Sequence, residues 1–590
     1  MQYSLDQKLS ALGQISQEKL LTILKEIHGK KDFIIEPSLI KPLERFIGVT
    51  KLRSSGVDKI YKLEKVDTPF TNTQRVFFIT DDLITVKQVC DKISGEISQN
   101  NDGNSYHIIL ISRKLGSITH LLEEEGIYGY ISLHSFHWEL IQLDTRILSL
   151  EAQNFYKNVF VEGDQSALSR VARSVWTLQM LFGKPPICIY QGKYSQKIEK
   201  MVEILHEELG GSDRLESDVS CLVMVDRDLD YASTLLTGGT YTSLLDEVLG
   251  INSGVIEVKS NNKDGNPVSS LLTSSDEIYS QIRSRHFSDV FPFLRTKTKE
   301  LNAVHQKSQT MAIQEMKRYI SQELPSVTNT KKKVAYHITA CECIISQMGN
   351  RFEGLQNTEK NMLDGRSKRE TITYIEDCLA MNVCDKYSIL RLLCLLSITQ
   401  DGLLQDELQK LKIQFLHMYG YQHLPLFHRL EKTGLCTEQA NLITTDVKGG
   451  HLANKVVQAV PLPTRRSTFT AFAQKLKLFP YITDGYDLKN PKDMGYVFSG
   501  SYIPVVCQLI HLLIKKEMPF EDIIKMIPHC TYTCETPAPQ ALRTFIVYFV
   551  GGVTYAEISA FQLLEKLTGA TIIVAGTSIM NGNTLMKAFF

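Results

Sequence analysis

Short apolar segments alternate with amphipathic stretches near both ends of this chain, and this alternation constrains its fold more than any other feature. The segment 75–80 (RVFFIT) is aromatic and β-branched, as buried strands are. A second such segment lies at 106–111, and a further helical pattern lies near 117–125. Between the two apolar segments, apolar residues recur every three or four positions and predict one buried helix face: Leu83, Val86, Val89, Cys90, Ile93 and Ile97. The β-α-β-α order predicts a parallel sheet covered by helices.

The same alternation returns later in the chain. Residues 221–225 (CLVMV) form an apolar run, and residues 544–550 (TFIVYFV) form another. The second run is followed by a helical pattern at 554–567 and by a third apolar run at 571–575 (TIIVA), which makes a complete βαβ unit. The sequence therefore predicts α/β structure in three separate stretches of the chain.

Residues 270–440 have a different character, because helical patterns dominate there. The run 390–396 (LRLLCLL) is apolar at nearly every position, which predicts a helix buried on all sides. Residues 299–324 are amphipathic and are expected to extend from the body, whereas 446–463 is Gly-rich and then Pro-rich, as connecting loops are. The simplest interpretation is that the last α/β stretch completes the second sheet and that the helical region is inserted into it.

Composition limits the classes of function. At about 150 residues per domain, 590 residues predict three or four folding units. The 65 basic and 65 acidic residues cancel, so we expect no general attraction to nucleic acid. No run of about 18 apolar residues is present, so we expect a cytoplasmic protein that reaches membranes only through partners. The twelve cysteines lack zinc-finger spacing and are expected to be small buried side chains, with no metal site and no cofactor.

A glycine pair after the apolar run 544–550 is the first candidate site. Gly551 and Gly552 are followed by Thr554 and Glu557, which fit a capping box at a helix start. Helix N-termini favour anions, so this turn resembles the beginning of a phosphate-binding loop. It matches neither nucleotide-binding glycine motif, no lysine follows, and Glu557 would repel a phosphate. We therefore favour a tight structural turn.

A charged cluster at the end of the run 221–225 is the second candidate. Asp226, Arg227, Asp228 and Asp230 place carboxylates at the carboxyl edge of a predicted strand, where they would suit a divalent cation or phosphoryl transfer. An Asp–Arg ion pair or a helix-capping aspartate explains the same cluster. The structural explanation is favoured. Neither of the hydrolase motifs G-x-S-x-G and H-E-x-x-H occurs, so nothing in the sequence supports a catalytic site.

The segment 419–424 (YGYQHL) is the third candidate. It combines aromatic and apolar residues near a predicted helix end, and exposed side chains of this kind anchor protein interfaces. Packing in the core is the alternative explanation for Tyr421 and Leu424, and the sequence leaves it open.

Several segments together resemble the SM (Sec/Munc) family, in particular its vacuolar protein sorting branch of the thirty-three type. The segments follow the family order over nearly the whole chain: VMVDRDLDYASTLLTGGTYTSLLDEVLGI (223–251), YIEDCLA (374–380), LRLLCLLSITQDGL (390–403), YGYQHLPLFHRLEKTGL (419–435) and FVGGVTYAEISAFQLL (549–564). Further segments resemble the B-type members: EEEGIYG (123–129), HFSDVFPFL (286–294), YISQEL (319–324) and DLKNPKDMGYVFSGSYIPV (487–505).

The resemblance implies an arch-shaped, three-domain molecule of α/β plus α class. The implied division is 1–150 for the first α/β domain, 151–265 and 480–590 for the second, and 266–479 for an inserted helical domain. It also implies a non-enzymatic regulator that holds SNARE helices during fusion at late endosomes and lysosomes. A helical sixteen-type vacuolar protein sorting subunit is the implied partner, contacting Tyr421 and Leu424. A nucleotide-dependent enzyme and a tethering subunit that binds no SNARE remain the alternatives.

Overall fold

The computed structural model describes residues 4–64, 70–98, 103–111, 114–211, 216–259, 267–308, 324–349, 351–381, 384–439, 467–480, 486–534 and 542–590. The expected loop at 446–463 lies outside these ranges, as does most of the amphipathic stretch 299–324 beyond residue 308.

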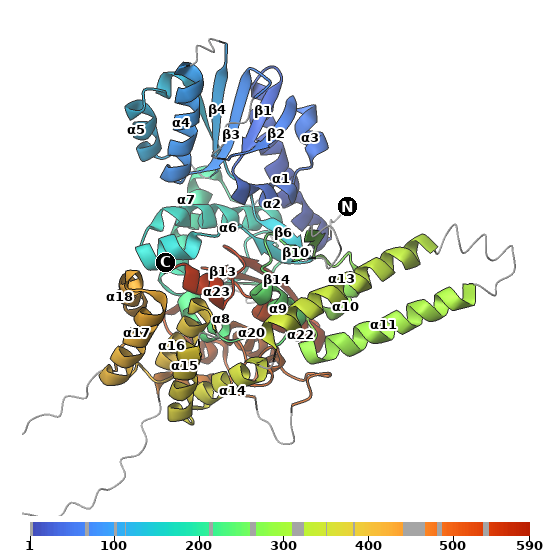
Figure 1. Ribbon diagram of the computed structural model, residues 1–590, viewed down its shortest axis with the longest axis vertical. Coiled ribbons are helices and arrows are strands. Elements are labelled where there is room, and N and C mark those ends of the chain that lie inside the picture. Colours follow the sequence, from blue (N-terminus) through green and yellow to red (C-terminus); the bar gives the residue numbers. More distant parts are fainter. Residues whose placement is uncertain are drawn as a thin grey trace, which may run out of the picture.

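The first sheet is wholly parallel and has the strand order β2-β1-β3-β4-β5. Its strands are β1 (Lys31–Ile35), β2 (Val57–Lys62), β3 (Gln74–Thr80), β4 (Ser105–Ile111) and β5 (Ile131–Phe136). Helices α1 (Leu5–Glu26), α2 (Pro37–Glu44) and α3 (Val49–Ser54) pack on one face, and α4 (Leu83–Ser98) and α5 (Gly116–Glu124) pack on the other. Figure 1 shows this unit at one end of the molecule. The parallel, helix-covered sheet predicted from the alternating pattern is confirmed.

Helix α4 confirms most of its predicted buried face. Val86, Val89, Cys90 and Ile93 are buried against the sheet. Leu83 is 46% exposed, so the prediction was wrong for this residue. It is the first residue of the helix, where the chain is still approaching the sheet, and the periodic pattern carries no information about that approach.

The second sheet has seven strands in the order β12-β8-β9-β13-β14-β7-β6, and its two edge strands are antiparallel to their neighbours. The strands are β6 (Ile141–Asp144), β7 (Ile147–Ser149), β8 (Ile187–Gln191), β9 (Cys221–Asp226), β12 (Cys530–Cys534), β13 (Thr544–Val550) and β14 (Thr571–Gly576). Strands β13 and β14 lie between β9 and β7, so the last α/β stretch does complete the second sheet. Strands β6 and β7 already belong to this sheet, so the chain changes sheets before the expected domain end at residue 150.

Helices cover both faces of the second sheet. On one face lie α6 (Leu168–Phe182) and α7 (Lys193–Leu209), with Leu9 and Leu12 of α1 completing the core. The other face packs against α20 (Val505–Lys515) and α22 (Tyr555–Thr568). The shorter elements of this part are η2 (Lys157–Glu162), η3 (Gln165–Ala167), η4 (Arg227–Leu229), α8 (Ala232–Leu235), α9 (Tyr241–Val248), η7 (Met494–Phe498), α21 (Phe520–Met526) and α23 (Gly582–Lys587).

A small hairpin, β10 (Val255–Lys259) and β11 (Pro267–Leu271), spans the expected start of the inserted region, and the described elements that follow it up to Leu476 are helical. Its helices are α10 (Glu277–Ile282), α11 (Phe287–Ser308), α13 (Leu324–Met348), α14 (Arg351–Asp364), α15 (Lys368–Met381), α16 (Lys386–Thr399), α17 (Gln405–Tyr419), η6 (Tyr421–His423), α18 (Leu424–Lys432) and α19 (Thr468–Leu476). Helix α16 contains the run 390–396, all of which is buried, as its uniform apolar pattern predicts. Helices α11 and α13 contact each other and extend together away from the body (Figure 1). Two parallel-sheet α/β units and a mostly helical insertion therefore make up the predicted α/β plus α architecture.

Candidate functional site

Asp226 is the last residue of β9, and its carboxylate caps helix α7. It accepts hydrogen bonds from the backbone N–H of Tyr194 (2.7 Å) and from the backbone N–H and hydroxyl of Ser195 (2.8 and 2.6 Å). Gly192 precedes the helix with φ +97°, and a Cβ there would lie 2.4 Å from Asp226 Oδ2. The turn therefore closes around the carboxylate. Burial raises the pKa of Asp226 to about 7, and the hydrogen bonds from Ser195 and Tyr194 oppose this rise.

Arg227 forms a buried ion pair with Glu557 of α22. Arg227 Nη1 lies 2.9 Å from Glu557 Oε2, and the two side chains are 1% and 0% exposed. Nη1 also donates to the Gly552 carbonyl (3.4 Å), and Nη2 donates to the Asp230 carbonyl. Because Glu557 is 330 residues away in the chain, this contact joins the end of β9 to the first turn of α22.

Glu557 is also hydrogen-bonded to Thr554, the N-cap of its own helix. Its Oε2 accepts hydrogen bonds from the backbone N–H and hydroxyl of Thr554 (2.9 and 3.0 Å), while the Thr554 hydroxyl accepts from the Glu557 N–H (3.1 Å). This is the predicted capping box. The carboxylate therefore occupies the position at the N-terminus of α22 that an anion would otherwise take.

The glycine pair makes this close packing possible. Gly551 has φ +111°, and a Cβ there would lie 2.8 Å from Arg227 Cβ and 2.9 Å from a ring carbon of Phe160. Gly552 has φ +113°, and a Cβ there would lie 2.6 Å from the sulfur of Met580. Protein atoms already surround the turn, so it leaves no room for a phosphate.

The remaining two aspartates of the cluster have different environments. Asp228 is exposed. Asp230 is buried and accepts hydrogen bonds from Ser233 of α8, from the Tyr502 hydroxyl (3.1 Å) and from the Val505 N–H at the start of α20 (3.0 Å). Of the two explanations that the sequence offered for the cluster, a helix-capping aspartate describes the contacts of Asp226. The proposed Asp–Arg pairing is replaced by Arg227–Glu557, because the adjacent carboxylates are directed to helix N-termini.

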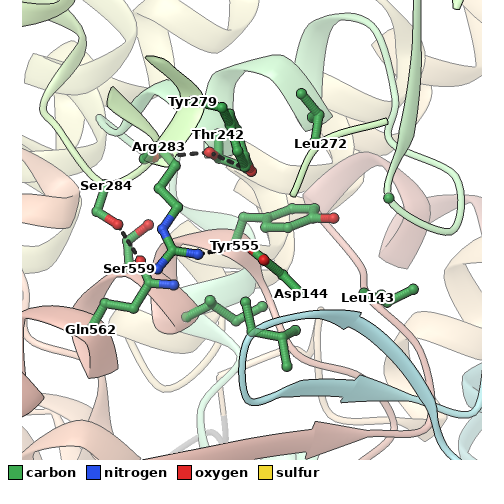
Figure 2. A pocket seen from close by; sticks show the side chains of 13 residues that line it. Leu143, Asp144, Thr242, Leu272, Tyr279, Arg283, Ser284, Tyr555, Ser559 and Gln562 are labelled. Atoms are coloured by element: carbon green, nitrogen blue, oxygen red, sulfur yellow. Dashed lines mark hydrogen bonds and ion pairs between the residues drawn. The ribbon is translucent and has the colours of Figure 1, made fainter. Parts of the chain in front are cut away.

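The cavity shown in Figure 2 also leaves little room for a ligand. The cavity lies between the β6–β7 turn, α9, α10 and α22, and its volume is about 20 Å³, enough for about one water molecule. Arg283 donates to Asp144 (2.5 Å), and Thr242 and Tyr279 are joined by a hydrogen bond of 3.2 Å. These contacts fasten the inserted region to the second sheet. Among the described residues, no group of three His, Cys, Asp or Glu side chains is placed to hold a metal ion.

Tyr421 and Leu424 are on the surface. Tyr421, in η6, is 65% exposed, and Leu424, the first residue of α18, is 49% exposed. Beneath them Phe415 and Leu416 are buried, so the core at this point is built from α17. Core packing, the alternative that the sequence left open, does not apply to either side chain.

The surface continues onto residues that sequence reasoning did not find. His423 lies edge-to-face against Phe590 (centroids 4.9 Å apart), and Phe590 also contacts Tyr387 (5.4 Å). Lys386 Nζ lies 4.2 Å above the Phe590 ring. These residues come from α16, η6 and the chain end, and no local sequence pattern connects segments so far apart. We call Tyr421, His423, Leu424, Tyr387 and Phe590 the aromatic surface.

Comparison with known proteins gives the family. A model of the Sec1 family matches residues 31–588. Rat vacuolar protein sorting-associated protein 33B is 33% identical over 98% of this chain and 97% of its own length, and rat protein 33A is 26% identical with the same coverage. Among solved structures, the Unc18–syntaxin 1 complex from Monosiga brevicollis matches with a TM-score of 0.61 at 15% identity, over 98% of this chain and 99% of that one. The SM protein Vps45, solved with the Qa SNARE Tlg2, matches with a TM-score of 0.63 at 14% identity, over 99% and 98%.

These similarities confirm the resemblance to the SM family and its B-type vacuolar protein sorting members, and with it the arch-shaped, three-part architecture. Among the described residues, no helix combines the length and the apolar character that crossing a membrane requires. The family model extends over far more than half of the sequence, and the chain belongs to the Sec1 family.

Proposed function

We propose that this chain is a non-enzymatic regulator that binds SNARE helices and promotes vesicle tethering and fusion on the route from endosomes to lysosomes. Its membership of the Sec1 family and its similarity to proteins 33A and 33B support the trafficking role. Two of the structural neighbours were solved with SNARE proteins, and a third, Sly1p, was solved with a peptide of Sed5p. The protein would work in the cytoplasm and lie on late endosomal and lysosomal membranes through its partners.

The paired helices α11 and α13 are the observation that carries this proposal. They project from the body as two contacting helices (Figure 1), and each bears an exposed large apolar side chain. Phe291 of α11 is 45% exposed and Ile345 of α13 is 51% exposed. Exposed apolar groups on adjacent helices suit the apolar face of an incoming amphipathic helix, which is what a SNARE segment would present.

Capture of assembled SNARE bundles by the purified chain tests the proposal. We expect binding that Ile345→Asp weakens by about tenfold or more, since a buried interface anchor contributes at least about 1.4 kcal/mol. Ile84→Asp is the matched control, because Ile84 is an 80% exposed isoleucine on α4 of the first unit. Failure of the unmodified chain to retain SNAREs, with its partner complex intact, would favour a tethering subunit that binds none.

We propose further that the aromatic surface binds a helical sixteen-type subunit through Tyr421 and Leu424. Tyr421→Asp should abolish co-purification with this partner and leave the melting transition unchanged, because the ring is 65% exposed. Tyr130→Asp, which changes a 61% exposed tyrosine of the first unit, is the control and should keep the partner. Loss of folding in Tyr421→Asp would show a structural role instead. Within this proposal the division is 1–150, 151–265 with 480–590, and 266–479, except that the first domain ends earlier, between β5 and β6, where the chain leaves the first sheet.

A further inference from the structure

Strand β12 (Cys530–Cys534) forms an open edge of the second sheet. It pairs with β8 on one side, and among the described residues no strand pairs with its other side. Edge strands are usually protected by charged residues, by proline or by a bulge, because their unpaired backbone groups bind other strands. Two other edge strands carry such charges, β2 at Asp58, Lys59 and Lys62 and β6 at Asp144. Strand β12 contains neither a charge nor a proline, its register with β8 is regular, and four of its five residues are exposed.

The backbone of Tyr532, at the centre of this strand, is directed outward. Just before the strand, the Gly192 N–H donates to the His529 carbonyl (3.0 Å), and the register continues from there without a shift. In an antiparallel pair, residues that exchange such bonds alternate with residues whose N–H and C=O point to the other side. His529 and Thr531 therefore face β8 with their backbone groups, whereas Cys530 and Tyr532 direct theirs to the open edge. An extended segment can bind there through main-chain hydrogen bonds.

The sequence of β12 reads the same in both directions, Cys-Thr-Tyr-Thr-Cys. We propose that its open edge binds the β12 strand of a second copy of this chain, in an antiparallel pair with a two-fold axis at Tyr532. In that pairing every residue lies opposite one of its own type, with Tyr532 opposite Tyr532 at the centre and Cys530 opposite Cys534 at the ends. Aromatic and Thr–Thr pairs across strands are favourable, and no like charges oppose each other because the strand carries none. A two-fold contact of this kind closes with two copies.

The side chain of Tyr532 adds an aromatic contact to the pairing. Its ring lies edge-on to Phe520 of α21, with the centroids 5.1 Å apart, and the residue is 40% exposed. In the pair, the two Tyr532 rings lie side by side, each against its own Phe520, and cover surface that is open to solvent in the single chain. A five-residue contact is small beside the about 1,200–2,000 Å² of stable dimers, so we expect a weak dimer. The contact includes no residue of α11, α13 or the aromatic surface, so it does not depend on the proposed partners.

Sedimentation velocity of the full chain in dithiothreitol tests the pairing. The mass should rise from that of the 66.9 kDa monomer at about 1 µM towards twice this value at about 200 µM. Tyr532→Lys should stay monomeric, because the two-fold axis brings the two introduced charges together. Ile60→Lys is the matched control, since Ile60 lies on the edge strand β2 and is also 40% exposed, and this variant should dimerise like the native chain.

A proline at the same position tests the backbone contact separately from the side chain. Tyr532→Pro removes an outward N–H but no hydrogen bond to β8, so the fold should tolerate it while dimerisation is lost. Dimers that persist in both Tyr532 variants would show that the contact lies on another surface and overturn the proposal. A native chain that stays monomeric up to about 200 µM would also overturn it, and would leave this edge to an extended segment of a different protein.

The two cysteines of β12 report the register of the pair. Cys530 is half-buried and Cys534 is exposed, so the expectation of buried cysteines is wrong for Cys534. Opposite residues of a hydrogen-bonded antiparallel pair have Cα atoms about 5.5 Å apart, within the about 4.4–6.8 Å that a disulfide spans. Oxidation of the concentrated chain with copper–phenanthroline should therefore link Cys530 of one copy to Cys534 of the other, seen as a dimer on a non-reducing gel and as a linked pair of peptides.

Single serine variants separate this register from chance contacts between exposed thiols. Neither Cys530→Ser nor Cys534→Ser should cross-link through β12 alone, because the remaining cysteine then faces a serine of the second copy. A mixture of the two variants should cross-link, because it restores one opposed pair of cysteines. Cross-linking of Cys530→Ser through two Cys534 thiols, or no cross-link in the mixture, would overturn the two-fold pairing at Tyr532.

Discussion

Replacing Arg227 by methionine is the most informative perturbation of the second sheet. The substitution keeps an apolar stem of similar length beside Phe549, over whose ring the Arg227 guanidinium lies at 5.6 Å. It removes the cation that lies 2.9 Å from Glu557 and leaves that carboxylate 0% exposed. It also removes the donors to the carbonyls of Gly552 and Asp230. The contacts to Gly552 and Glu557 join the end of β9 to the turn after β13 and to α22, whereas the contact to Asp230 is local.

The expected cost is large because one buried charge is left without its partner. Breaking a buried ion pair by removing one member costs about 3–5 kcal/mol, whereas an exposed pair contributes about 0–1 kcal/mol. For a unit of this size that loss lowers the melting temperature by about 10 °C. Lys297→Met is the matched control, because Lys297 pairs with Glu300 at 2.8 Å with side chains 33% and 55% exposed.

Thermal unfolding of the two single variants and the double variant checks this reasoning. Arg227→Met and Glu557→Met should each be strongly destabilised, and the double variant should cost clearly less than their sum, because neither charge is then stranded. Additive costs, or a melting temperature of Arg227→Met equal to that of Lys297→Met, would refute the structural role. A phosphate-binding Arg227 would behave differently: its loss would leave melting unchanged and abolish stabilisation by added nucleotide and magnesium.

Two further predictions concern the same region and the inserted helices. Gly551→Ala should cost several kcal/mol in unfolding free energy, because the new Cβ would lie 2.8 Å from Arg227 Cβ and the backbone has φ +111°. The control Gly126→Ala, at φ +70° with no atom within 4 Å of the new Cβ, should cost about 1 kcal/mol. Equal chemical denaturation midpoints for the two variants would contradict this prediction. Glu359 accepts hydrogen bonds from the Thr237 N–H and hydroxyl, and burial raises its pKa to about 7. The raised pKa of Glu359 stabilises the folded state at low pH, and this contribution is lost as pH rises from about 4.5 to 7. Over that pH range, the melting temperature of the native chain should therefore fall more steeply than that of Glu359→Gln. Parallel curves would show that Glu359 does not titrate there.

Much of the α/β architecture could be predicted, because buried strands and amphipathic helices leave clear periodic signals. The run 571–575 and the capping box at Thr554 were identified in this way. Strand β12 gave no such signal, since four of its five residues are exposed and it is paired only along one edge. The short strand β7 joins the second sheet by pairing with β14, which is more than 400 residues later in the chain, and β6 joins it by pairing with β7. Such pairings depend on the whole sheet and not on local sequence.

For the candidate site residues, too, local sequence could not predict contacts between distant segments. The sequence favoured a structural explanation for the cluster at 226–230, yet the partner of Arg227, Glu557, could not be deduced, because helix capping and ion pairing draw on the same residue types. Tyr421 and Leu424 were identified, but their exposure was not, since aromatic residues near a helix end occur in cores and at interfaces alike. Phe590 and Lys386 were missed because only the folded chain brings them together.

The carboxyl edge of a parallel sheet is where α/β proteins usually bind ligands, and here the protein's own charged side chains occupy that position. Asp226 caps α7, Asp230 caps α8 and α20, and Arg227 pairs with Glu557 of α22. A phosphate at α22 would have to displace Glu557 from Arg227 and leave this buried carboxylate without its cation, at a cost of about 3–5 kcal/mol. A ligand of millimolar affinity gains only about 4.1 kcal/mol in total, so the exchange would consume nearly all of its binding free energy. The helix caps and the Arg227–Glu557 ion pair therefore stabilise the second α/β unit, from which α11, α13 and the aromatic surface project. We expect partner binding at those exposed helices, where apolar side chains such as Ile345 and Leu424 are already open to solvent.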